Sequence, residues 1–526
     1  MLNIKQLYVV ILAFLYVGLA TAQDKTPIYA AKVTKDGKYG LVGLNGKFII
    51  PPQYDNIDVF NDGMAMVQKD NLYGFVNQAG QVIVAPQYEE AYNYFEGIAC
   101  VKKDGKYGFI NKSGELVVPC QFDKVDNFNN PLKTVQMNGK WGFADKTGNM
   151  VIPAKYDYVK NFTEGLAAVN NGGKFIGENV IQGGKWGYID NTGKMVIPEQ
   201  FEDAWTFTSD GLGIVKKQGK WGYIDKSGKM VIAAQFYACS TFNNGFASVQ
   251  KEGGYGLINR AGKLLTTQPF AALGDNFYDD LMTAQFGKKW GYIDKTGKMV
   301  IQAQYDEASH FSNGLGMVKK MGRTGWIDKT GKLVIPAIYI EATPFSEKTG
   351  IAAVSVGLKP SAPPAPGAKP APIERKWGMI DKTNNKVVDN IYDQINPEAI
   401  KGLILVVKDG QYGFIDPTGK EVIAPKYDEA RDFTEDGLAA ISVSDKWGYI
   451  NTQGVVVIKP QFDEVSDFSF GMAPVSKNSK WGFIDKTGKL IIPAQFDQAT
   501  QFINMNKSAG GNTPGTNGGD DTSGDD

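Results

Sequence analysis

A glycine recurs thirteen times along the 526-residue chain at the same point of a local pattern, and an aromatic residue precedes it in twelve of these places. Successive glycines are 34 or 35 residues apart except at two places, a period typical of repeat proteins. Each unit of such a protein packs mainly on its neighbours, so chain length counts repeats and does not count independent domains. The twelve pairs are Tyr39-Gly40, Tyr73-Gly74, Tyr107-Gly108, Trp141-Gly142, Trp186-Gly187, Trp221-Gly222, Tyr255-Gly256, Trp290-Gly291, Trp377-Gly378, Tyr412-Gly413, Trp447-Gly448 and Trp481-Gly482, and Thr324-Gly325 is the degenerate thirteenth copy.

One repeat, taken from Gly211 to Phe242, contains three short runs of β-branched, aliphatic and aromatic residues. Turns that contain glycine separate the runs, and this pattern predicts a three-stranded antiparallel meander. The turn Asp225-Lys226-Ser227-Gly228 begins with a side chain that can bond the backbone two residues on, and it ends with a residue that can take a positive φ. We therefore expect an all-β protein of about thirteen tandem meanders.

The meanders could form an open or superhelical array, or one or two rings like those of β-propellers. Propellers commonly have four strands per blade and four to eight blades, so thirteen three-stranded units fit a single ring poorly. The array begins with a complete first strand, Tyr29 to Val33, and ends after a third strand, Leu490 to Ile492. No strand is then left over to join the two ends. These considerations favour the open array and keep propeller-like rings as the alternative.

The aromatic-glycine pair lies inside a predicted strand, where glycine usually marks a bulge or the close approach of another backbone. We expect each ring to pack across the gap that a glycine leaves on an adjacent strand or module, as a buried spacer, because large aromatic side chains dominate core energetics. All twelve pairs are therefore predicted to be structural residues of the repeat core. The alternative is a row of exposed rings that bind a ligand.

The connector after the third strand is equally regular. A Tyr or Phe followed by Asp or Glu recurs there in ten copies, and a Phe follows six or seven residues later in twelve. We expect turn or extended chain that seals neighbouring modules. Lysines concentrate in the Asp-Lys-Thr-Gly-Lys turns and acids in connectors, for example at Asp428, Glu429, Asp463 and Glu464. This separation predicts two stripes of opposite charge that could steer a partner.

The two ends of the chain differ from the repeats. Residues 1–22 have the features of a secretory signal peptide, with Lys5 before an apolar segment and small residues before Gln23. The repeat array is expected over residues 29–502, with long loop insertions near 171–184 and 357–375. Residues 503–526 are rich in Gly, Asn and Asp and are expected to form a disordered tail. The mature protein is then extracytoplasmic, whether secreted, periplasmic or at the cell surface, and has no transmembrane segment.

Charge and residue types argue against several function classes. The chain carries 56 basic and 56 acidic side chains, without the basic excess typical of nucleic-acid binding. His310 is the single histidine, and no His and Cys cluster has the spacing of metal ligands. The repeated carboxylates are equivalent by the symmetry of the repeat, so none is marked as catalytic. We expect no catalytic, cofactor or metal site and no enzyme activity, and a glycan-active enzyme with paired carboxylates is the lowest-ranked alternative.

The segment Lys-Trp-Gly-Tyr-Ile-Asp, at residues 220–225, and the following Lys-Ser-Gly-Lys-Met-Val-Ile resemble the bacterial WG repeat family, also called KWG. The resemblance extends from about Tyr29 to Phe502. Members of that family are typically secreted or surface proteins of undefined biochemical role, so the resemblance implies a repeat type and a location and no mechanism. Copy nine departs from the pattern at Thr324, where the ring is expected to be displaced to Trp326, and copy ten lacks the connector Phe near Pro397. The resemblance does not predict how these two modules pack.

The sequence as a whole indicates a non-enzymatic scaffold that presents an extended surface to a protein partner at the cell envelope, because stacked repeats make long binding surfaces. The alternative is binding of a cell-wall or extracellular glycan through the repeat aromatics. That alternative requires exposed rings, so burial of Trp141, Trp221 and Trp481 would count against it.

Overall fold

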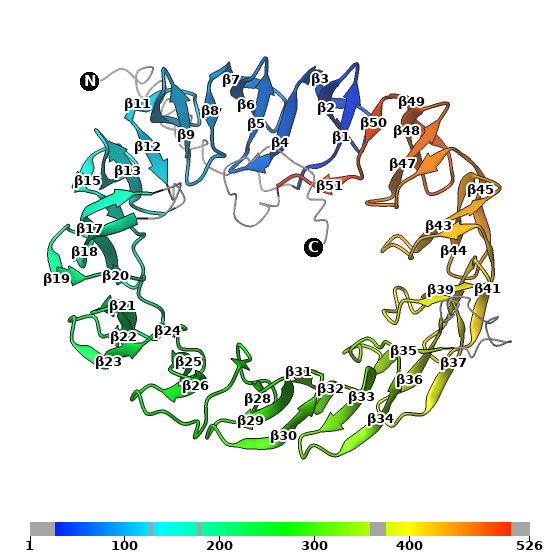
Figure 1. Ribbon diagram of the computed structural model, residues 1–526. Helices are drawn as coiled ribbons and strands as arrows, with labels where there is room; N and C mark the ends of the chain where they lie inside the picture. Colours follow the sequence, from blue (N-terminus) through cyan, green and yellow to red (C-terminus); the bar gives the residue numbers. More distant parts are fainter. Residues whose placement is uncertain (1–26, 127–129, 177–180, 358–374, 507–526) are drawn as a thin grey trace, which may run out of the picture. The chain divides into compact units, whose positions relative to one another are not determined.

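Each repeat of the computed structural model is a small antiparallel β-sheet (Figure 1), as the turn spacing predicts. The structure describes residues 27–126, 130–176, 181–357 and 375–506. Within these residues the chain forms thirteen sheets of three to five strands and no helix. The predictions of an all-β class and of a tandem array of thirteen meanders are confirmed.

The chain divides into two units. One unit contains Met1–Cys120, Lys480–Gly482 and Ile491–Asp526, and the other contains Gln121–Ser479 and Phe483–Leu490. The strands up to residue 122 are β1 (Tyr29–Lys35), β2 (Lys38–Gly43), β3 (Phe48–Tyr54), β4 (Asn56–Asn61), β5 (Met64–Lys69), β6 (Leu72–Asn77), β7 (Val82–Tyr88), β8 (Glu90–Ala91), β9 (Ile98–Lys103), β10 (Lys106–Asn111) and β11 (Leu116–Phe122).

The strands between residues 124 and 339 are β12 (Lys124–Asp126), β13 (Lys133–Met137), β14 (Lys140–Ala144), β15 (Met150–Tyr156), β16 (Tyr158–Val159), β17 (Leu166–Phe175), β18 (Ile181–Asp190), β19 (Met195–Phe201), β20 (Asp203–Ala204), β21 (Gly213–Lys217), β22 (Lys220–Ile224), β23 (Met230–Phe236), β24 (Ala238–Cys239), β25 (Phe246–Lys251), β26 (Gly254–Asn259), β27 (Ala272–Leu273), β28 (Leu281–Phe286), β29 (Lys289–Asp294), β30 (Met299–Tyr305), β31 (Glu307–Ser312), β32 (Leu315–Lys320), β33 (Arg323–Asp328) and β34 (Leu333–Tyr339).

The remaining strands are β35 (Ile351–Gly357), β36 (Arg375–Asp381), β37 (Lys386–Tyr392), β38 (Gln394–Ile395), β39 (Ile404–Lys408), β40 (Gln411–Ile415), β41 (Glu421–Tyr427), β42 (Glu429–Ala430), β43 (Leu438–Val443), β44 (Lys446–Asn451), β45 (Val456–Phe462), β46 (Glu464–Val465), β47 (Met472–Lys477), β48 (Lys480–Asp485), β49 (Leu490–Phe496), β50 (Gln498–Ala499) and β51 (Ile503–Asn504).

The connector supplies a fourth strand to most sheets. In the order β20-β21-β22-β23, the last three strands are the predicted meander, and the two-residue strand β20 comes from the connector of the preceding repeat. Asp203 pairs with Lys216 and Ala204 with Val215 in antiparallel register. The connector is therefore extended chain that joins neighbouring repeats, as predicted. Each sheet of this type contains residues from two successive repeats.

The chain ends pair in the same way within the first unit. The C-terminal strand β50 pairs with β1 through Val33 and Ala499, and β51 pairs with β1 through Ala30 and Ile503 (Figure 1). The expectation that no strand is left over to join the ends is wrong, because two-residue connector strands were not included in the strand count. One of the two reasons for preferring an open array over propeller-like closure therefore does not hold.

The predicted segment boundaries are adjusted at two places. Met505 is 2% exposed and packs in the first core cluster, so the folded part extends to Asn506 and not only to residue 502. The insertion near 171–184 is a lengthened hairpin instead of a loop, since Gly173 pairs with Gly183 and Phe175 with Ile181. The signal peptide at 1–22, residues 358–374 of the second insertion and residues 507–526 of the tail lie outside the described residues.

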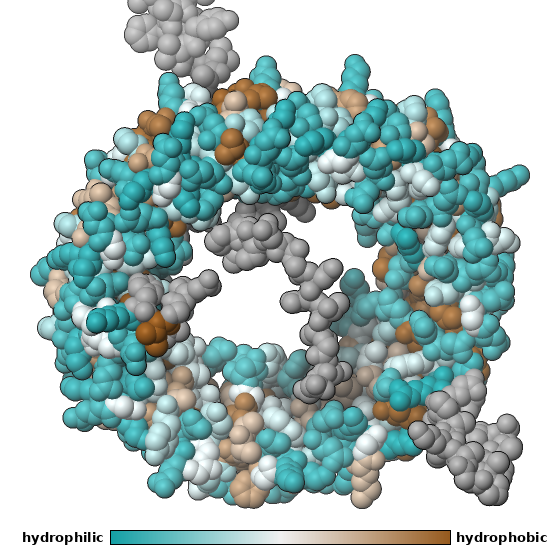
Figure 2. All heavy atoms as spheres, turned by 45° about the horizontal axis from the view of Figure 1, so that its top comes forward, coloured by the Kyte–Doolittle hydropathy of each residue, from teal (hydrophilic) through white to brown (hydrophobic). Residues whose placement is uncertain are grey.

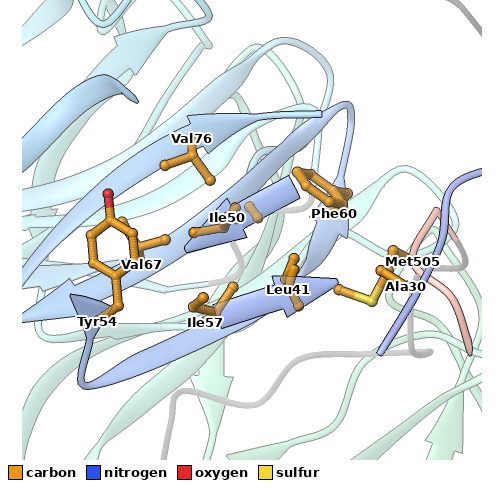
Figure 3. Close-up of a cluster of buried hydrophobic side chains, with 10 residues drawn as sticks. Ala30, Leu41, Ile50, Tyr54, Ile57, Phe60, Val67, Val76 and Met505 are labelled. Carbon is orange, nitrogen blue, oxygen red and sulfur yellow. The ribbon is translucent and has the colours of Figure 1, made fainter. Parts of the chain in front are cut away.

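The hydrophobic cores lie between successive sheets. Figure 3 shows one of them, in which Leu41 and Ile50 of the first sheet face Val67 and Val76 of the second, with Phe60 of β4 beside them. Successive side chains of a strand point to opposite faces, so each sheet contributes to two cores. In several repeats the first strand carries two neighbouring alanines, and each is buried in the core on a different face of the sheet. Ala167 lies in one core and Ala168 lies in the next.

The repeated glycine is explained by a bulge in the third strand. In β22 and β23, Trp221 pairs with Phe236 and Tyr223 pairs with Ile232. A step of two residues along β22 therefore corresponds to a step of four residues along β23, which is a bulge in β23. A Cβ on Gly222 would lie 2.6 Å from the Ile232 carbonyl oxygen and 2.7 Å from the Ala234 nitrogen. The predicted close backbone approach is thus confirmed. In twelve repeats the gap beside the glycine is filled by backbone atoms of the third strand of the same sheet, and beside Gly256 by the side chains of Leu264 and Thr266, whereas we expected a ring to fill it.

We predict that Gly222→Ala destabilises the protein by about 1–3 kcal/mol, because the added methyl group has no space beneath the bulge. The midpoint of urea unfolding, followed by circular dichroism, measures the loss. Gly43→Ala is the matched control, since its Cβ would approach Asn45 no closer than 3.3 Å. Equal midpoints for the two variants would contradict this account of the glycine.

Candidate binding surface

The twelve predicted core rings are only partly enclosed. Trp141, Trp186 and Tyr107 are buried, with 6%, 4% and 9% exposure, whereas the other nine rings are of intermediate exposure. All twelve glycines are buried. Of the three rings that would argue against glycan binding if buried, Trp141 is buried and Trp221 and Trp481 are half-buried.

The main core side chain of each repeat is the residue after the glycine, which the sequence prediction missed. It is at most 2% exposed in all thirteen repeats. The signal was present in the sequence, because this residue is also aromatic in most copies. The residues are Leu41, Phe75, Phe109, Phe143, Tyr188, Tyr223, Leu257, Tyr292, Trp326, Met379, Phe414, Tyr449 and Phe483.

This core residue holds the connector in place. The Tyr223 ring lies 5.0 Å from the Phe242 ring between centroids, and its hydroxyl donates a 2.7 Å hydrogen bond to the Ser240 carbonyl oxygen. Tyr292 and Tyr449 make the same two contacts with their own connectors. Burial raises the pKa of the Tyr223 hydroxyl well above its usual value, so it stays a donor. The connector Phe recognised in the sequence is thus the partner of the residue after the glycine.

Copies nine and ten keep their packing. Trp326 pairs with Ile335, as the core aromatic does in other repeats, and its ring lies 5.2 Å from that of Phe345. The ring is therefore not displaced, and Thr324 simply lacks one. In copy ten, Met379 takes the core position and is fully buried, in the same repeat that lacks the connector Phe. A flexible thioether side chain can fill the space of the missing pair.

A second set of contacts, which we call the clasp, joins the connector acid to two repeats. Lys376, the Lys that precedes the aromatic-glycine pair, lies 2.5 Å from Asp393. The other carboxylate oxygen of Asp393 accepts a 3.0 Å hydrogen bond from the Gly410 N–H in the first turn of the next repeat. The same ion pair recurs as Lys38–Asp55, Lys140–Asp157, Lys289–Asp306, Lys446–Asp463 and Lys480–Asp497.

Acids and lysines also meet at a second position. Asp62 lies 2.7 Å from Lys112, and Asp436 lies 2.6 Å from Lys486, so turn lysines pair with acids of an earlier repeat. Asp463, one of the acids assigned to a separate stripe, pairs with Lys446. Lys446 begins β44 and is not one of the turn lysines, so the prediction of two stripes, formed by turn lysines and connector acids, stays a prediction.

The turn aspartates also have structural partners. Asp225 accepts hydrogen bonds from the Ser227 N–H at 2.9 Å, the Lys229 N–H at 3.1 Å and the Ser227 hydroxyl at 2.6 Å. The Ser227 hydroxyl and these N–H groups hold the pKa of the Asp225 carboxyl below its usual value. Over the described part of the chain there is no group of three or more His, Cys, Asp or Glu residues that could hold a metal ion. None of the described residues forms a helix long and apolar enough to cross a membrane.

The third strand of each sheet presents an exposed aliphatic residue. This strand lies at the edge of its sheet, and the residue before its buried Ile is between 36% and 42% exposed in eight repeats, in seven of which it is Val. An exposed Pro follows the buried Ile in several copies and limits pairing with a further strand. We call this set the edge-valine row. Its members are Val151, Val196, Val231, Val300, Val334, Val422 and Val457.

We predict a small, pH-dependent loss of stability for the clasp variant Asp393→Asn. Partial burial alone would raise the pKa of Asp393, but the Lys376 ammonium group and the Gly410 N–H lower it below its ordinary value. The contribution of the carboxylate to stability is therefore complete above about pH 4 and is lost as the pH falls through the lower, folded-state pKa.

At pH 7 the variant should lose no more than about 1 kcal/mol of unfolding free energy, because the ion pair is partly solvated. The difference from the parent protein should vanish in acid below the folded-state pKa. Urea unfolding at both pH values measures this difference. Asp389→Asn, at a carboxylate that is 73% exposed, is the control. A difference that is independent of pH would contradict this assignment.

Comparison with known proteins identifies the repeat. The chain matches a family model described as WG containing repeat in twelve segments, from residue 39 to residue 506. The segments are 39–73, 73–107, 107–141, 141–175, 186–221, 221–255, 290–323, 325–357, 377–412, 412–447, 447–481 and 481–506. Residues 256–289 lie outside the matches. In that repeat the third run makes only isolated bridges, Tyr255 with Phe270 and Ile258 with Leu264.

Solved structures show weak likeness. A eukaryotic initiation factor is 10% identical, with 72% of this chain and 96% of that chain covered and a TM-score of 0.27. The extracellular domain of BT4673 from B. thetaiotaomicron is 10% identical, with coverage of 89% and 77% and a TM-score of 0.20. Sqt1 from Saccharomyces cerevisiae is 10% identical, with coverage of 55% and 91% and a TM-score of 0.22.

TM-scores of this size carry no argument about function. No curated protein sequence matches the chain. The segments that match the family model span most of the array and begin at the aromatic-glycine pair, and on this basis the chain belongs to the WG-containing repeat family.

Proposed function

We propose that this chain is a non-enzymatic repeat scaffold that binds a protein partner through its edge-valine row. The observation that carries the proposal is the recurrence of one exposed β-branched residue at the same position of successive third strands. A single exposed apolar residue is ordinary on a protein surface. Repetition along the strand edges instead supplies a series of equivalent apolar contacts, which suits an extended partner.

The form of these side chains supports the proposal. Valine has a restricted χ1 angle, so little side-chain entropy is lost when a partner covers it. The prolines in the same edge strands limit backbone pairing, and recognition would therefore use side chains. In Figure 2 the apolar residues form small separate patches within a hydrophilic surface on the face shown. A partner would contact several small sites and would not need one large hydrophobic patch.

The structural hydrogen bonds and ion pairs of the repeated carboxylates support a non-enzymatic role. One carboxylate oxygen of Asp225 accepts three hydrogen bonds within its own turn, and Asp393 is shared between a lysine and a backbone N–H. A site outside the cytoplasm at the cell envelope is part of the proposal, and it rests on the signal-peptide features of residues 1–22. Glycan binding is a second candidate, supported by half-buried rings such as Trp221 and Trp481.

The test uses a triple variant, Val196→Lys, Val231→Lys and Val300→Lys. The partner is identified by cross-linking to the mature parent protein in its source cells, then purified, and its affinity is measured by titration calorimetry. We expect affinity for the variant to fall by at least about tenfold, because buried lysine ammonium groups must be desolvated at the contact. The melting temperature should be unchanged, since all three valines are exposed.

The matched control is Gln200→Lys, Gln235→Lys and Gln302→Lys, which adds the same charge at other exposed positions of the same strands. Its affinity should remain that of the parent protein. Equal affinities for the valine variant and the parent would refute the edge-valine row as the binding surface, and failure to cross-link any protein would refute the protein-scaffold function.

A further inference from the structure

Repeat six, the repeat of Gly222, carries an exposed tryptophan outside the repeated pattern. Trp205 lies after β20, four residues beyond Phe201 in the connector, and it is 41% exposed. Its ring meets the half-buried Trp221 ring edge-on, with 5.9 Å between centroids. The same connector position is serine in three other repeats, at Ser240, Ser309 and Ser466. The fold therefore does not require an indole at this position.

The chain around Trp205 is held in place before any ligand binds. The Trp205 N–H donates a 2.8 Å hydrogen bond to the Ile214 carbonyl oxygen of β21. The Lys160 ammonium group donates a 2.7 Å hydrogen bond to the carbonyl oxygen of Ala204, the preceding residue. Since the ring is also braced against Trp221, little conformational entropy is left to lose when a ligand covers the indole.

Two charged side chains lie on the same face of the sheet as the tryptophan pair. Asp203 pairs with Lys216 across β20 and β21, and Lys216 pairs with Trp221 across β21 and β22. Directly paired residues of an antiparallel sheet point to the same face. The Lys216 ammonium group lies 5.7 Å from the Trp221 ring centroid, and the ring contact places Trp205 on that face too. We call this set, Asp203, Trp205, Lys216 and Trp221, the repeat-six site.

The acid and the lysine at these paired positions form an ion pair in two other repeats. Glu90 pairs with Lys102 in register, and their charged groups are 2.6 Å apart. Glu307 and Lys319 make the same pair at 3.0 Å. In repeat three the hydroxyl of the aromatic-glycine tyrosine, Tyr107, donates a further hydrogen bond to Glu90. The acid and the lysine of these repeats are therefore engaged with each other.

Repeat six leaves the equivalent groups apart. Asp203 is one methylene group shorter than a glutamate, and Trp221 has no hydroxyl group that could donate to it. Within the described part of the chain, Asp203 accepts the Ala204 N–H at 2.7 Å, and neither Asp203 nor Lys216 forms an ion pair. A hydrogen-bond acceptor and a donor thus lie at paired positions of one face, beside an exposed indole, without binding each other.

We propose that the repeat-six site binds a neutral pyranose residue of a polysaccharide, an inference that rests on glycan binding, the second candidate function. A pyranose with equatorial hydroxyl groups has an apolar C–H face that can cover the Trp205 ring, and it has polar groups around its edge. Each hydroxyl group both donates and accepts hydrogen bonds. Two neighbouring hydroxyls can therefore accept from the Lys216 ammonium group and donate to the second carboxylate oxygen of Asp203 while the sugar stacks on the indole.

Other ligands fit this combination of groups less well. An anionic sugar or an acidic peptide would be attracted by Lys216 but repelled by Asp203, so the two charges give it no net attraction. An apolar peptide side chain could cover the indole, but it would desolvate the carboxylate and the ammonium group without bonding either. Neutral hydroxyl groups satisfy both charges at once, and hydrogen bonds to charged groups are the stronger ones.

The repeat-six site is separate from the edge-valine row. In the sheet order β20-β21-β22-β23 the exposed valine lies on β23, whereas Trp205 follows β20 at the other edge. Binding of a protein partner and binding of a sugar are therefore measured separately, and the failure of one leaves the other standing.

The experiment titrates cellohexaose and xylohexaose into the full mature protein and follows binding by calorimetry and tryptophan fluorescence. Oligogalacturonate and a capped phenylalanine peptide are the comparison ligands. We expect at least one neutral oligosaccharide to bind, with a change in tryptophan emission because Trp205 is exposed, and with little dependence on added salt. The comparison ligands should not bind at the same concentrations.

The deciding variant is Asp203→Glu, which supplies the missing methylene group and allows Lys216 the ion pair that the equivalent glutamates make. It should lower the affinity for the neutral oligosaccharide by at least about tenfold, while the melting temperature stays the same or rises. Trp205→Ser, which introduces the residue of three other connectors, should lower the affinity at least as much. Lys217→Gln is the matched control, because the next residue of β21 points to the opposite face, and it should leave the affinity unchanged.

Every other result overturns the proposal. Binding of neither neutral oligosaccharide shows that the site does not take such a sugar. Equal binding of oligogalacturonate assigns the site to an anionic ligand, and equal binding of the phenylalanine peptide assigns it to an apolar one. Unchanged affinity in Asp203→Glu, or an equal loss in Lys217→Gln, places the observed binding elsewhere on the chain.

Discussion

The close contact between the repeated glycine and the bulged third strand is the constraint on which the rest of the repeat depends. With a Cβ at Gly222, the Ile232 carbonyl and the Ala234 nitrogen could not lie where they do. The bulge brings Phe236 opposite Trp221 and turns the chain toward the next sheet. From there the connector adds the strand β24, whose Cys239 pairs with Val249 of the following repeat. A contact within one sheet therefore determines how the next sheet is joined.

The contacts between sheets differ greatly in strength. The cores between sheets bury the residue after the glycine completely, and the loss of such a side chain is expected to cost about 3–5 kcal/mol where it is aromatic. The clasps are partly solvated ion pairs, which are worth up to about 1 kcal/mol each. Because every core contains side chains from two sheets, a single repeat has no complete core of its own. Stability is thus a property of neighbouring pairs of repeats.

Local patterns in the sequence were enough to predict the meander, the turns and the close approach at glycine. The Asp225 turn depends only on the five adjacent residues from Asp225 to Lys229, and its hydrogen bonds are those expected. The fourth strand was missed because a two-residue strand such as β20 has no periodicity of its own. The pairing of β1 with β50 was missed because it joins residues more than 460 positions apart.

Sequence proximity also misled in one case. Trp326 was interpreted as a displaced ring, yet the register with Ile335 shows that it occupies the ordinary core position. The clasp between Lys446 and Asp463 forms because the connector returns to the start of the second strand. The edge-valine row could have been found from the alternation of the third strand.

The difference in strength between these contacts indicates where a repeat protein of this type can acquire function. The glycine is present in all thirteen repeats, where a change costs about 1–3 kcal/mol, and the core residue after it is always large, where loss of an aromatic side chain costs about 3–5 kcal/mol. The clasp acid is replaced by Tyr237, Ala271 and Ile340 in three repeats, since its loss costs little. Substitutions at the weakest structural contact can therefore accumulate with little effect on the fold. A binding site in such an array is expected at exposed positions of this kind, where a substitution changes the surface and leaves the cores between sheets intact.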